Sequence, residues 1–248
     1  MYGYFEIQSR IGITKHMGGL TATRRLLERC HIDDTKCVLV VGSGSGVSAI
    51  KIAQLTQSRV VGIDLSDAMI KCAKEQLASD IEFIVGDAED IQFPDNTFDA
   101  VLSESVTAFT DREKSLPEYS RVLKRGGYLG LNEVTWLVSP TAEIIKYALT
   151  VTEGLNPTDQ DGWVASMQRA GFTELSVEAG PLKKFEQFIG ELRMNGPQIP
   201  KVFSSFFSAY LSDREYRKSI HHLARASLKM PRGFLQAFGC GLYVGKKE

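Results

Sequence analysis

An apolar run leads directly into a cluster of glycines near the start of the chain, and this junction constrains the fold more than any other feature. Residues 38–41 (VLVV) are wholly apolar, and three glycines alternate with serines immediately after them, at positions 42, 44 and 46. A second apolar run, residues 60–63 (VVGI), ends in Asp64. A strand, a glycine turn, a helix and another strand form the repeating unit of a parallel sheet that helices cover on both faces.

The glycine turn and the acid beyond the second strand also predict a binding site. Glycines let backbone N–H groups approach a ligand that any Cβ atom would keep away. An acid at the position of Asp64 is placed to accept hydrogen bonds from a ribose diol. Together they indicate a cofactor that contains a nucleoside. The dinucleotide fingerprint G-x-G-x-x-G needs a glycine where Val47 stands, so the turn alone leaves the identity of the cofactor open.

Three later segments narrow that choice. They are residues 83–90 (FIVGDAED), 93–101 (FPDNTFDAV) and 121–129 (RVLKRGGYL). In order with the first two motifs, they resemble the class I S-adenosylmethionine-dependent methyltransferases over roughly residues 37–133. The similarity is greatest to the small-molecule group of this family, which includes the ubiquinone/menaquinone C-methyltransferases and the sterol- and tocopherol-type enzymes.

The resemblance implies S-adenosylmethionine as the cofactor and assigns residues to it. The glycines of the turn would hold the methionine moiety close to the backbone; they are Gly42, Gly44 and Gly46. Asp64 would bind the ribose hydroxyls, and Leu65 would pack against the adenine. Asp87 would accept a hydrogen bond from the adenine amino group, and Ala88 would contribute a backbone N–H. Ser103 would lie beside the sulfonium.

One position departs from the family pattern. Relatives usually carry an acid two residues before the first glycine, where it helps to orient the glycine loop and the amino group of the cofactor. This chain has Val40 there. The departure leaves the ribose and adenine contacts in place, and its expected effect is on the affinity for the cofactor.

The acceptor of the methyl group must lie beyond the carboxyl ends of the strands. Glu104 follows the fourth strand and Glu133 lies near the end of the fifth, where Asn132 and Trp136 also leave the sheet. His16 belongs to a leading segment that could fold over the pocket. The two acids and His16 are therefore the candidates for a general base, which is needed only where the acceptor must lose a proton. The alternatives are a structural hydrogen bond or a solvated carboxylate for the acids, and a packed or surface position for His16.

Strand and helix patterns alternate from residue 37 onward, which predicts an α/β fold with a doubly wound, seven-stranded Rossmann-like sheet. The expected strands are 37–41, 59–63, 81–85, 98–103, 127–134, 172–179 and an antiparallel last strand at 236–244. The expected helices of the core are 46–55, 67–78, 111–124, 141–153 and 159–170. Asp67 is the expected N-cap of the second of these helices, and Gly126 and Gly127 are expected to end the third.

The whole chain, 1–248, is interpreted as a single methyltransferase domain with four segments. They are an N-terminal helical lid (1–34, with a helix near 21–30), the cofactor-binding core (35–180), a helical insertion (181–232, broken at Gly196 and Pro197) and the last strand (233–248). Gly18 and Gly19 would permit a hinge in the lid. Aromatic residues of the insertion recur at helical spacing, which favours core packing over an acceptor pocket; they are Phe203, Phe206, Phe207 and Tyr210.

Composition excludes several classes of partner. A net charge of −1 gives no general attraction to nucleic acid. The four cysteines are scattered and no histidine lies at zinc spacing, so no metal site is expected and the thiols are those of a reduced, cytoplasmic protein. No apolar run approaches the roughly 20 residues that a membrane span needs. Basic residues between 214 and 232 leave open a contact with a membrane surface, and the sequence fixes no oligomeric state.

The leading hypothesis is therefore a methyltransferase that uses S-adenosylmethionine and acts on a small-molecule acceptor. The resemblance points to a hydrophobic acceptor of quinone-, sterol- or lipid-like type. One alternative is a non-catalytic protein that binds S-adenosylmethionine, which Val40 supports. The other is a NAD-dependent oxidoreductase, which Val47 and the Gly-Asp-Ala-Glu segment at 86–89 argue against.

Overall fold

The computed structural model describes residues 2–11, 15–76, 81–152, 154–182 and 184–248. Its strands are β1 (Cys37–Val41), β2 (Arg59–Asp64), β3 (Glu82–Val85), β4 (Phe98–Glu104), β5 (Leu123–Trp136), β6 (Thr158–Asp159), β7 (Phe172–Pro181) and β8 (Phe238–Lys247). Its helices are α1 (Tyr4–Ile11), α2 (Gly19–Arg29), α3 (Val47–Thr56), α4 (Asp67–Lys74), α5 (Arg112–Val122), α6 (Ala142–Thr152), α7 (Gln160–Arg169), α8 (Lys184–Asn195), α9 (Ile199–Ser212), α10 (Arg214–Leu228) and α11 (Phe234–Ala237). Two short 3-10 turns, η1 (Thr107–Phe109) and η2 (Gly196–Gln198), complete the list.

The strands form one twisted sheet in the order β3-β2-β1-β4-β5-β8-β7. The neighbours from β3 to β5 are parallel, whereas β8 runs antiparallel to both β5 and β7. Order and direction confirm the predicted doubly wound sheet with an antiparallel last strand. The structure adds the two-residue strand β6, which pairs with the end of β5.

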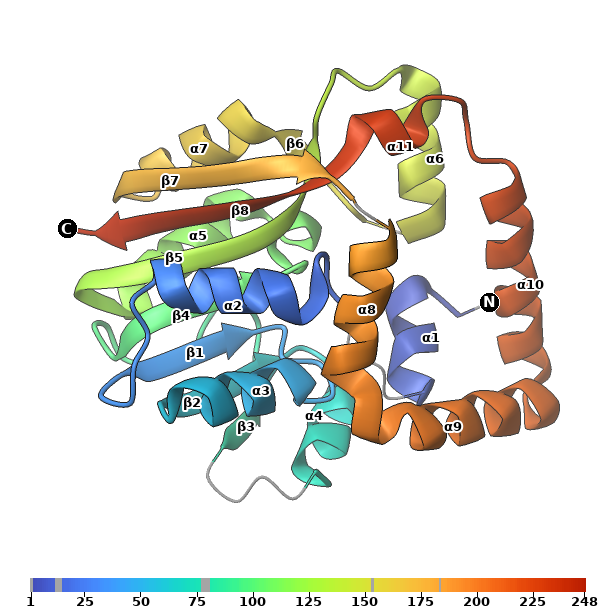
Figure 1. Cartoon of the computed structure of the whole chain (residues 1–248), viewed down its shortest axis with the longest axis horizontal. Helices are drawn as coiled ribbons and strands as arrows, with labels where there is room; N and C mark the ends of the chain where they lie inside the picture. Colours follow the sequence, from blue (N-terminus) through green and yellow to red (C-terminus); the bar gives the residue numbers. More distant parts are fainter. Residues whose placement is uncertain (1, 12–14, 77–80, 153, 183) are drawn as a thin grey trace.

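Two apolar cores cover the two faces of the sheet, because successive side chains of a strand point to opposite faces. In β1, Leu39 and Val41 belong to the core under α5 and α7, and Val38 and Val40 to the core under α2 and α3. Figure 1 shows these helices on opposite faces of the sheet. Full burial of β1 explains why its sequence is a continuous apolar run and not an alternating one.

Several predicted boundaries were wrong for local reasons. Helix α4 is capped by Ser66, whose hydroxyl accepts from the N–H of Met69, so Asp67 is the first helical residue and not the cap. Helix α5 ends at Val122, and Gly126 and Gly127 lie in an irregularity of β5, where the pairing with β4 shifts register. The expected helix 67–78 ends earlier, at Lys74 with Glu75 as its C-cap, and 77–80 lie outside the described residues.

Differences also occur at the two ends of the chain. Residues 236 and 237 belong to the short helix α11 before β8 begins, and helix α1 precedes the predicted helix α2. The predicted break in the insertion is confirmed, since η2 separates α8 from α9.

The leading segment and the insertion pack together at the carboxyl edge of the parallel strands. Helix α1 lies against α9, and α2 lies against α8 (Figure 1). Asp213, which caps α10, accepts hydrogen bonds from the hydroxyl of Tyr2 at 2.8 Å and from Arg10 at 3.0 Å. We call α1 and α8–α10 the cap. Segments that meet across more than 200 positions of sequence therefore form one cover over the sheet edge.

Candidate active site

A cavity of about 630 Å³ lies between the sheet edge and the cap. The loops that follow β1, β2, β3 and β4 form its floor, as expected for a doubly wound sheet. Residues from α1 and from the segment before α2 close its other side; they are Glu6, Gln8, Lys15 and His16.

The glycine turn after β1 lines this cavity with backbone. Gly42, Gly44 and Gly46 have φ of 65°, 54° and 85°, the left-handed region that side chains disfavour. The N–H of Ser43 donates to the carbonyl of Ile63 at 2.8 Å, which ties the turn to β2. A Cβ atom at Gly42 would lie 2.2 Å from Cγ2 of Val106, so both conformation and close approach require glycine there.

Asp64 lies at the end of β2 and faces the same cavity. Its Oδ2 accepts from the N–H of Gly44 at 2.8 Å and its Oδ1 from the N–H of Ser66 at 2.9 Å. Burial raises the pKa of this carboxyl, and the two backbone donors act in the opposite direction by stabilising the ionised form. The acid that the sequence singled out thus connects the glycine turn to the next loop.

The residues expected around an adenine lie along the same wall. Leu65 is 73% exposed although it is a large apolar side chain, and it lines the cavity together with Met69, Asp87 and Ala88. Oδ1 of Asp87 accepts from the N–H of Glu89 at 2.9 Å, which fixes the turn after β3. An exposed apolar side chain beside an acid at the mouth of a cavity fits the face and the amino edge of a purine.

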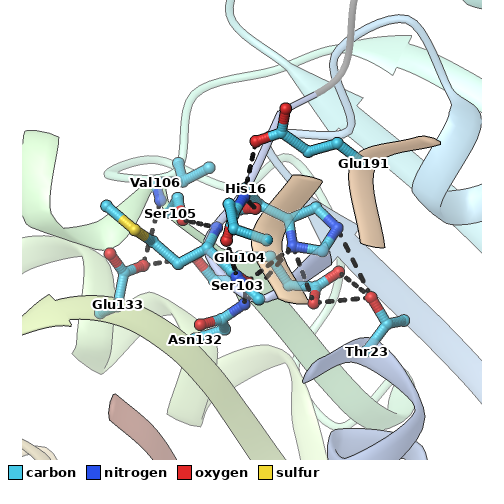
Figure 2. A network of polar contacts seen from close by, with 12 residues as sticks. His16, Thr23, Ser103, Glu104, Ser105, Val106, Asn132, Glu133 and Glu191 are labelled. Carbon is cyan, nitrogen blue, oxygen red and sulfur yellow. Dashed lines mark hydrogen bonds and ion pairs between the residues drawn. The ribbon is translucent and has the colours of Figure 1, made fainter. Parts of the chain in front are cut away.

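His16 and Glu104 lie side by side on the wall of the same cavity (Figure 2). Glu104 ends β4, and its Oε1 lies 3.6 Å from Nδ1 of His16. The hydroxyl of Thr23, from α2, donates to Glu104 at 2.9 Å and lies 3.5 Å from Nε2 of His16. Both ring nitrogens of His16 therefore face protein atoms, and the amide of Asn132 approaches Nδ1 at 3.4 Å.

Asn132 secures this arrangement from β5. Its side-chain N–H donates to the carbonyl of Met17 at 2.5 Å, and the N–H of Met17 donates to Oγ of Ser105 at 3.1 Å. The segment before α2 is thus fastened to β5 and to the loop after β4. The start of α2 also packs tightly on α8, since a Cβ atom at Gly19 would lie 2.6 Å from the carbonyl carbon of Gly190.

Ser103 lies away from its expected place beside the sulfonium, and Glu133 has the structural hydrogen-bonding role that the sequence left open. Ser103 is fully buried, and its hydroxyl shares a hydrogen bond with Thr107 at 2.7 Å. Glu133 is also fully buried and accepts backbone N–H groups of the loop after β4 (Figure 2). Neither side chain lines the cavity. The position of each residue along its strand was predictable from the sequence, but the full burial of its side chain was not.

Other candidates also take different roles. Val40, at the position of the missing family acid, lines the cavity while it packs in the core. Trp136 packs against Phe238 in the other core. The expected core packing of the aromatic residues of α9 fails for Phe203 and Phe207, which are 59% and 57% exposed. The aromatic residues of α9 do not line the cavity either.

Two further features concern metal binding and membranes. Within the described ranges, His, Cys, Asp and Glu side chains form no group of three or more that could hold a metal ion. In that same part of the chain, no helix is long and apolar enough to cross a membrane.

Comparison with known proteins identifies the core. Residues 39–131 match the methyltransferase domain family. Phosphoethanolamine N-methyltransferase 1 of Arabidopsis thaliana is 28% identical over 198 residues, which cover 78% of this chain and 39% of that protein. The ubiquinone/menaquinone biosynthesis C-methyltransferase UbiE of Marinomonas sp. is 29% identical over 130 residues, or 49% of this chain and 51% of that protein. The chain thus spans about half, or less, of the length of these curated relatives.

A solved structure shows the same fold. Phosphoethanolamine N-methyltransferase 2 of Haemonchus contortus, in complex with phosphomonomethylethanolamine and S-adenosylhomocysteine, superposes with a TM-score of 0.74 at 20% identity. The match covers 98% of this chain and 57% of that one. Sheet order, motif order and the matched family agree with the resemblance seen in the sequence, and residues 39–131 of this chain form a methyltransferase domain similar to those of the class I S-adenosylmethionine-dependent enzymes.

Proposed function

We propose that this protein transfers a methyl group from S-adenosylmethionine to a small-molecule acceptor. The observation that carries the proposal is that two chemically different groups of residues line one cavity. We call the glycine turn with Asp64 its first end, and His16 with Glu104 its reacting end. Methyl transfer requires donor and acceptor to meet in one enclosed space, where positioning alone can supply roughly 7–11 kcal/mol of the barrier.

The residues at the first end fit the cofactor. The backbone of Gly42 and Gly44 would lie against the methionine portion, Asp64 would accept from the ribose diol, and Leu65 with Asp87 would take the adenine. When bound, S-adenosylmethionine supplies a methyl group on a sulfonium that is open to in-line displacement. The left-handed backbone at Gly42 and Gly44 supports this assignment, because that conformation leaves the cavity side of the turn free of side chains.

Glu104 is the residue we assign to the reacting end. It lines the cavity at the carboxyl end of β4, and Thr23 directs a hydroxyl at it. The carboxylate can accept a proton from the acceptor or hold a cationic one. His16 acts on Glu104, since both of its ring nitrogens face protein atoms and Nδ1 lies 3.6 Å from the carboxylate. We therefore place His16 as the residue that positions Glu104, and Glu133 and Ser103 outside the reacting set.

The charge of the cavity limits the acceptor. Within the described part of the chain, the walls carry Glu6, Asp64, Asp87 and Glu104, against Lys15 and His16. Lys15 lies 3.6 Å from Glu191, which offsets its charge. Phosphate recognition relies on arginine and lysine clusters. We infer an acceptor without a phosphate group, neutral or cationic, in contrast to the phosphoethanolamine enzymes. Apolar walls at Val106 and Phe109 support the hydrophobic acceptor predicted from the sequence.

Cysteines and surface charges bear on the location of the protein and on its contact with membranes. The described cysteines are all free, which supports a reducing, cytoplasmic location. A membrane-surface contact is also proposed for the exposed side of α10, where Arg214, Lys218 and Arg225 are solvent-accessible.

The decisive experiment is a set of parallel calorimetric titrations with S-adenosylmethionine, S-adenosylhomocysteine and NAD. Binding of both sulfur nucleosides without NAD supports the proposal and opens a screen of acceptors, starting with uncharged phenols, quinols and amines. Saturable binding without turnover across that screen favours a non-catalytic binding protein. Binding of NAD alone would replace the proposal with an oxidoreductase.

A further inference from the structure

Glu133 is a buried carboxylate whose hydrogen bonds from backbone N–H groups converge on one short loop, while the hydroxyl of Ser103 on β4 also donates to it at 3.4 Å. Its Oε1 accepts from the N–H of Thr107 at 2.7 Å and from the N–H of Val106 at 3.1 Å. Its Oε2 accepts from the N–H of Ala108 at 3.3 Å. Three successive amides, at the start of the 3-10 turn η1, thus point at one side chain from β5; Figure 2 shows the first of them, that of Val106, beside Glu133. This pattern is that of a carboxylate that holds a loop, and it leaves no oxygen directed at the cavity.

The loop that Glu133 holds forms part of both ends of the cavity. Ser105, Val106, Phe109 and Thr110 line it from this loop, next to Glu104. Ser105 has φ of 62°, an uncommon conformation for a side-chain-bearing residue, so the loop needs fixed contacts to stay in place. The side chain of Val106 also packs so close to Gly42 that a Cβ atom added there would lie 2.2 Å from it. Whatever fixes Val106 therefore fixes the glycine turn as well.

Backbone N–H groups, and no ion pair among the described residues, stabilise the ionised form of Glu133. Among the described residues, no lysine, arginine or histidine lies within ion-pair distance of it. Arg112 on α5 acts on it through space, Tyr119 on α5 shares Thr107 with it, and Tyr243 on β8 lies beyond Thr135. Glu104 follows Ser103 on β4. Burial raises the pKa of Glu133 to about 7, against which the three backbone donors act.

We infer that Glu133 is a positioning residue that holds residues 105–110, and through Val106 the glycine turn, only while its carboxylate is ionised. The neutral acid is a poorer acceptor for three amides than the anion, so proton uptake releases the loop. The inference on the loop stands on the contacts alone. Its effect on cofactor binding rests on the proposed function.

Hydrogen exchange of the free protein tests the loop directly. Amides of residues 106–108 should exchange roughly tenfold faster one unit below the pKa of Glu133 than one unit above it, after correction for the intrinsic rate. Glu133→Gln keeps an acceptor oxygen without a titrating charge, and its loop should show no such pH dependence. Glu118→Gln is the matched control. Glu118 also holds a backbone N–H, that of Ile91 at 2.8 Å, but lies outside the cavity, and its variant should keep the wild-type pH dependence at 106–108.

A second measurement uses the wild-type protein alone, so it does not depend on whether a variant folds. Infrared titration of the wild type should show a carboxylic-acid C=O band that disappears with a midpoint near the pKa of about 7. The inference is overturned if loop exchange is independent of pH in the wild type, or if Glu133→Gln follows the wild-type profile. Titration with S-adenosylhomocysteine then separates the two claims: affinity should rise with pH in the wild type and stay flat in Glu133→Gln. Absence of binding at both pH values would contradict the proposed function but not the exchange result.

Discussion

Oδ2 of Asp64 accepts a hydrogen bond from the N–H of Gly44 at 2.8 Å, so the acid at the end of β2 fixes the glycine turn at the end of β1. The same carboxylate is the one proposed to bind a ribose. It therefore has two tasks, to shape the turn and to bind the cofactor, and substitutions at Asp64 should affect both.

Asp64→Ala should weaken the binding of S-adenosylhomocysteine by about 1–3 kcal/mol, because it removes a buried acceptor from both backbone and ligand. Asp64→Asn keeps one acceptor oxygen and should lose less. Asp67→Ala is the control, since Asp67 is exposed and pairs with Lys71 outside the cavity. Calorimetry measures all three variants, and unchanged affinity in Asp64→Ala would remove this residue from the site.

Gly42→Ala should abolish measurable cofactor binding and lower the melting temperature. Alanine at position 42 would have to adopt a φ of 65°, which side chains disfavour, and its Cβ atom would collide with Val106. Gly154→Ala separates the two causes, because Gly154 has φ of 84° but nothing within 4 Å of the added carbon. The control should therefore show only the conformational cost, about 1 kcal/mol. Equal losses of stability in the two variants would show that the contact with Val106 is unimportant.

Glu104→Gln should leave S-adenosylhomocysteine affinity nearly unchanged while turnover on an identified acceptor falls. A base is typically worth about 10²–10⁴ in rate. Thr23→Val, which removes the hydroxyl bound to Glu104, should reduce turnover to a smaller extent. A normal rate in Glu104→Gln would exclude it as the base.

The stability of the protein should fall as pH rises from about 4.5 to about 7. Glu133 has a folded-state pKa of about 7 against an ordinary value of 4.5, so the folded state binds the extra proton within this window. The associated stability is present below 4.5 and is lost as pH passes 7, by roughly 3 kcal/mol. Denaturant unfolding of wild type and Glu133→Gln should show this slope in the wild type alone. Over the same pH range, the protection of amides 106–108 from hydrogen exchange should rise. An acid with no role in holding this loop would not produce that rise.

Asp213→Ser should release α1 from the cap and leave α10 capped. Serine can still accept from the N–H groups of Glu215 and Tyr216, but it is too short to replace the contacts with Tyr2 and Arg10. Limited proteolysis should then cleave within residues 2–11 faster than in the wild type. Unchanged cleavage would show that other contacts hold α1.

The half of the site that we propose for the cofactor was predictable because its constraints are local in sequence. Asp64 follows its strand directly, and the glycines must be glycine for reasons of backbone conformation, so motif spacing places them in one cavity. The sheet order followed from the same regularity. The Ser66 cap was missed because Asp67, also a capping type, stands next to it.

The acceptor half was less predictable because it depends on contacts between distant segments. His16 and Glu104 are 88 positions apart in sequence, and their meeting depends on Thr23 and Asn132, which no motif singles out. Glu133 and Ser103 have suitable positions along their strands, but whether a side chain there reaches the cavity depends on how the loop after β4 folds over it. The exposure of Phe203 and Phe207 likewise depends on which face α9 turns to α1.

Strand β8 is the last strand of the chain, yet it lies between β5 and β7. During synthesis, β1 to β5 with their glycine turn can therefore assemble well before β7 has any partner in the sheet. Such late pairing of distant strands is slow, and it leaves the edge of β5 exposed to other chains in the meantime. A ligand that binds the early-formed half would stabilise the nascent sheet during that interval. Cofactor supply in the cell could then influence how much of this protein reaches its folded state.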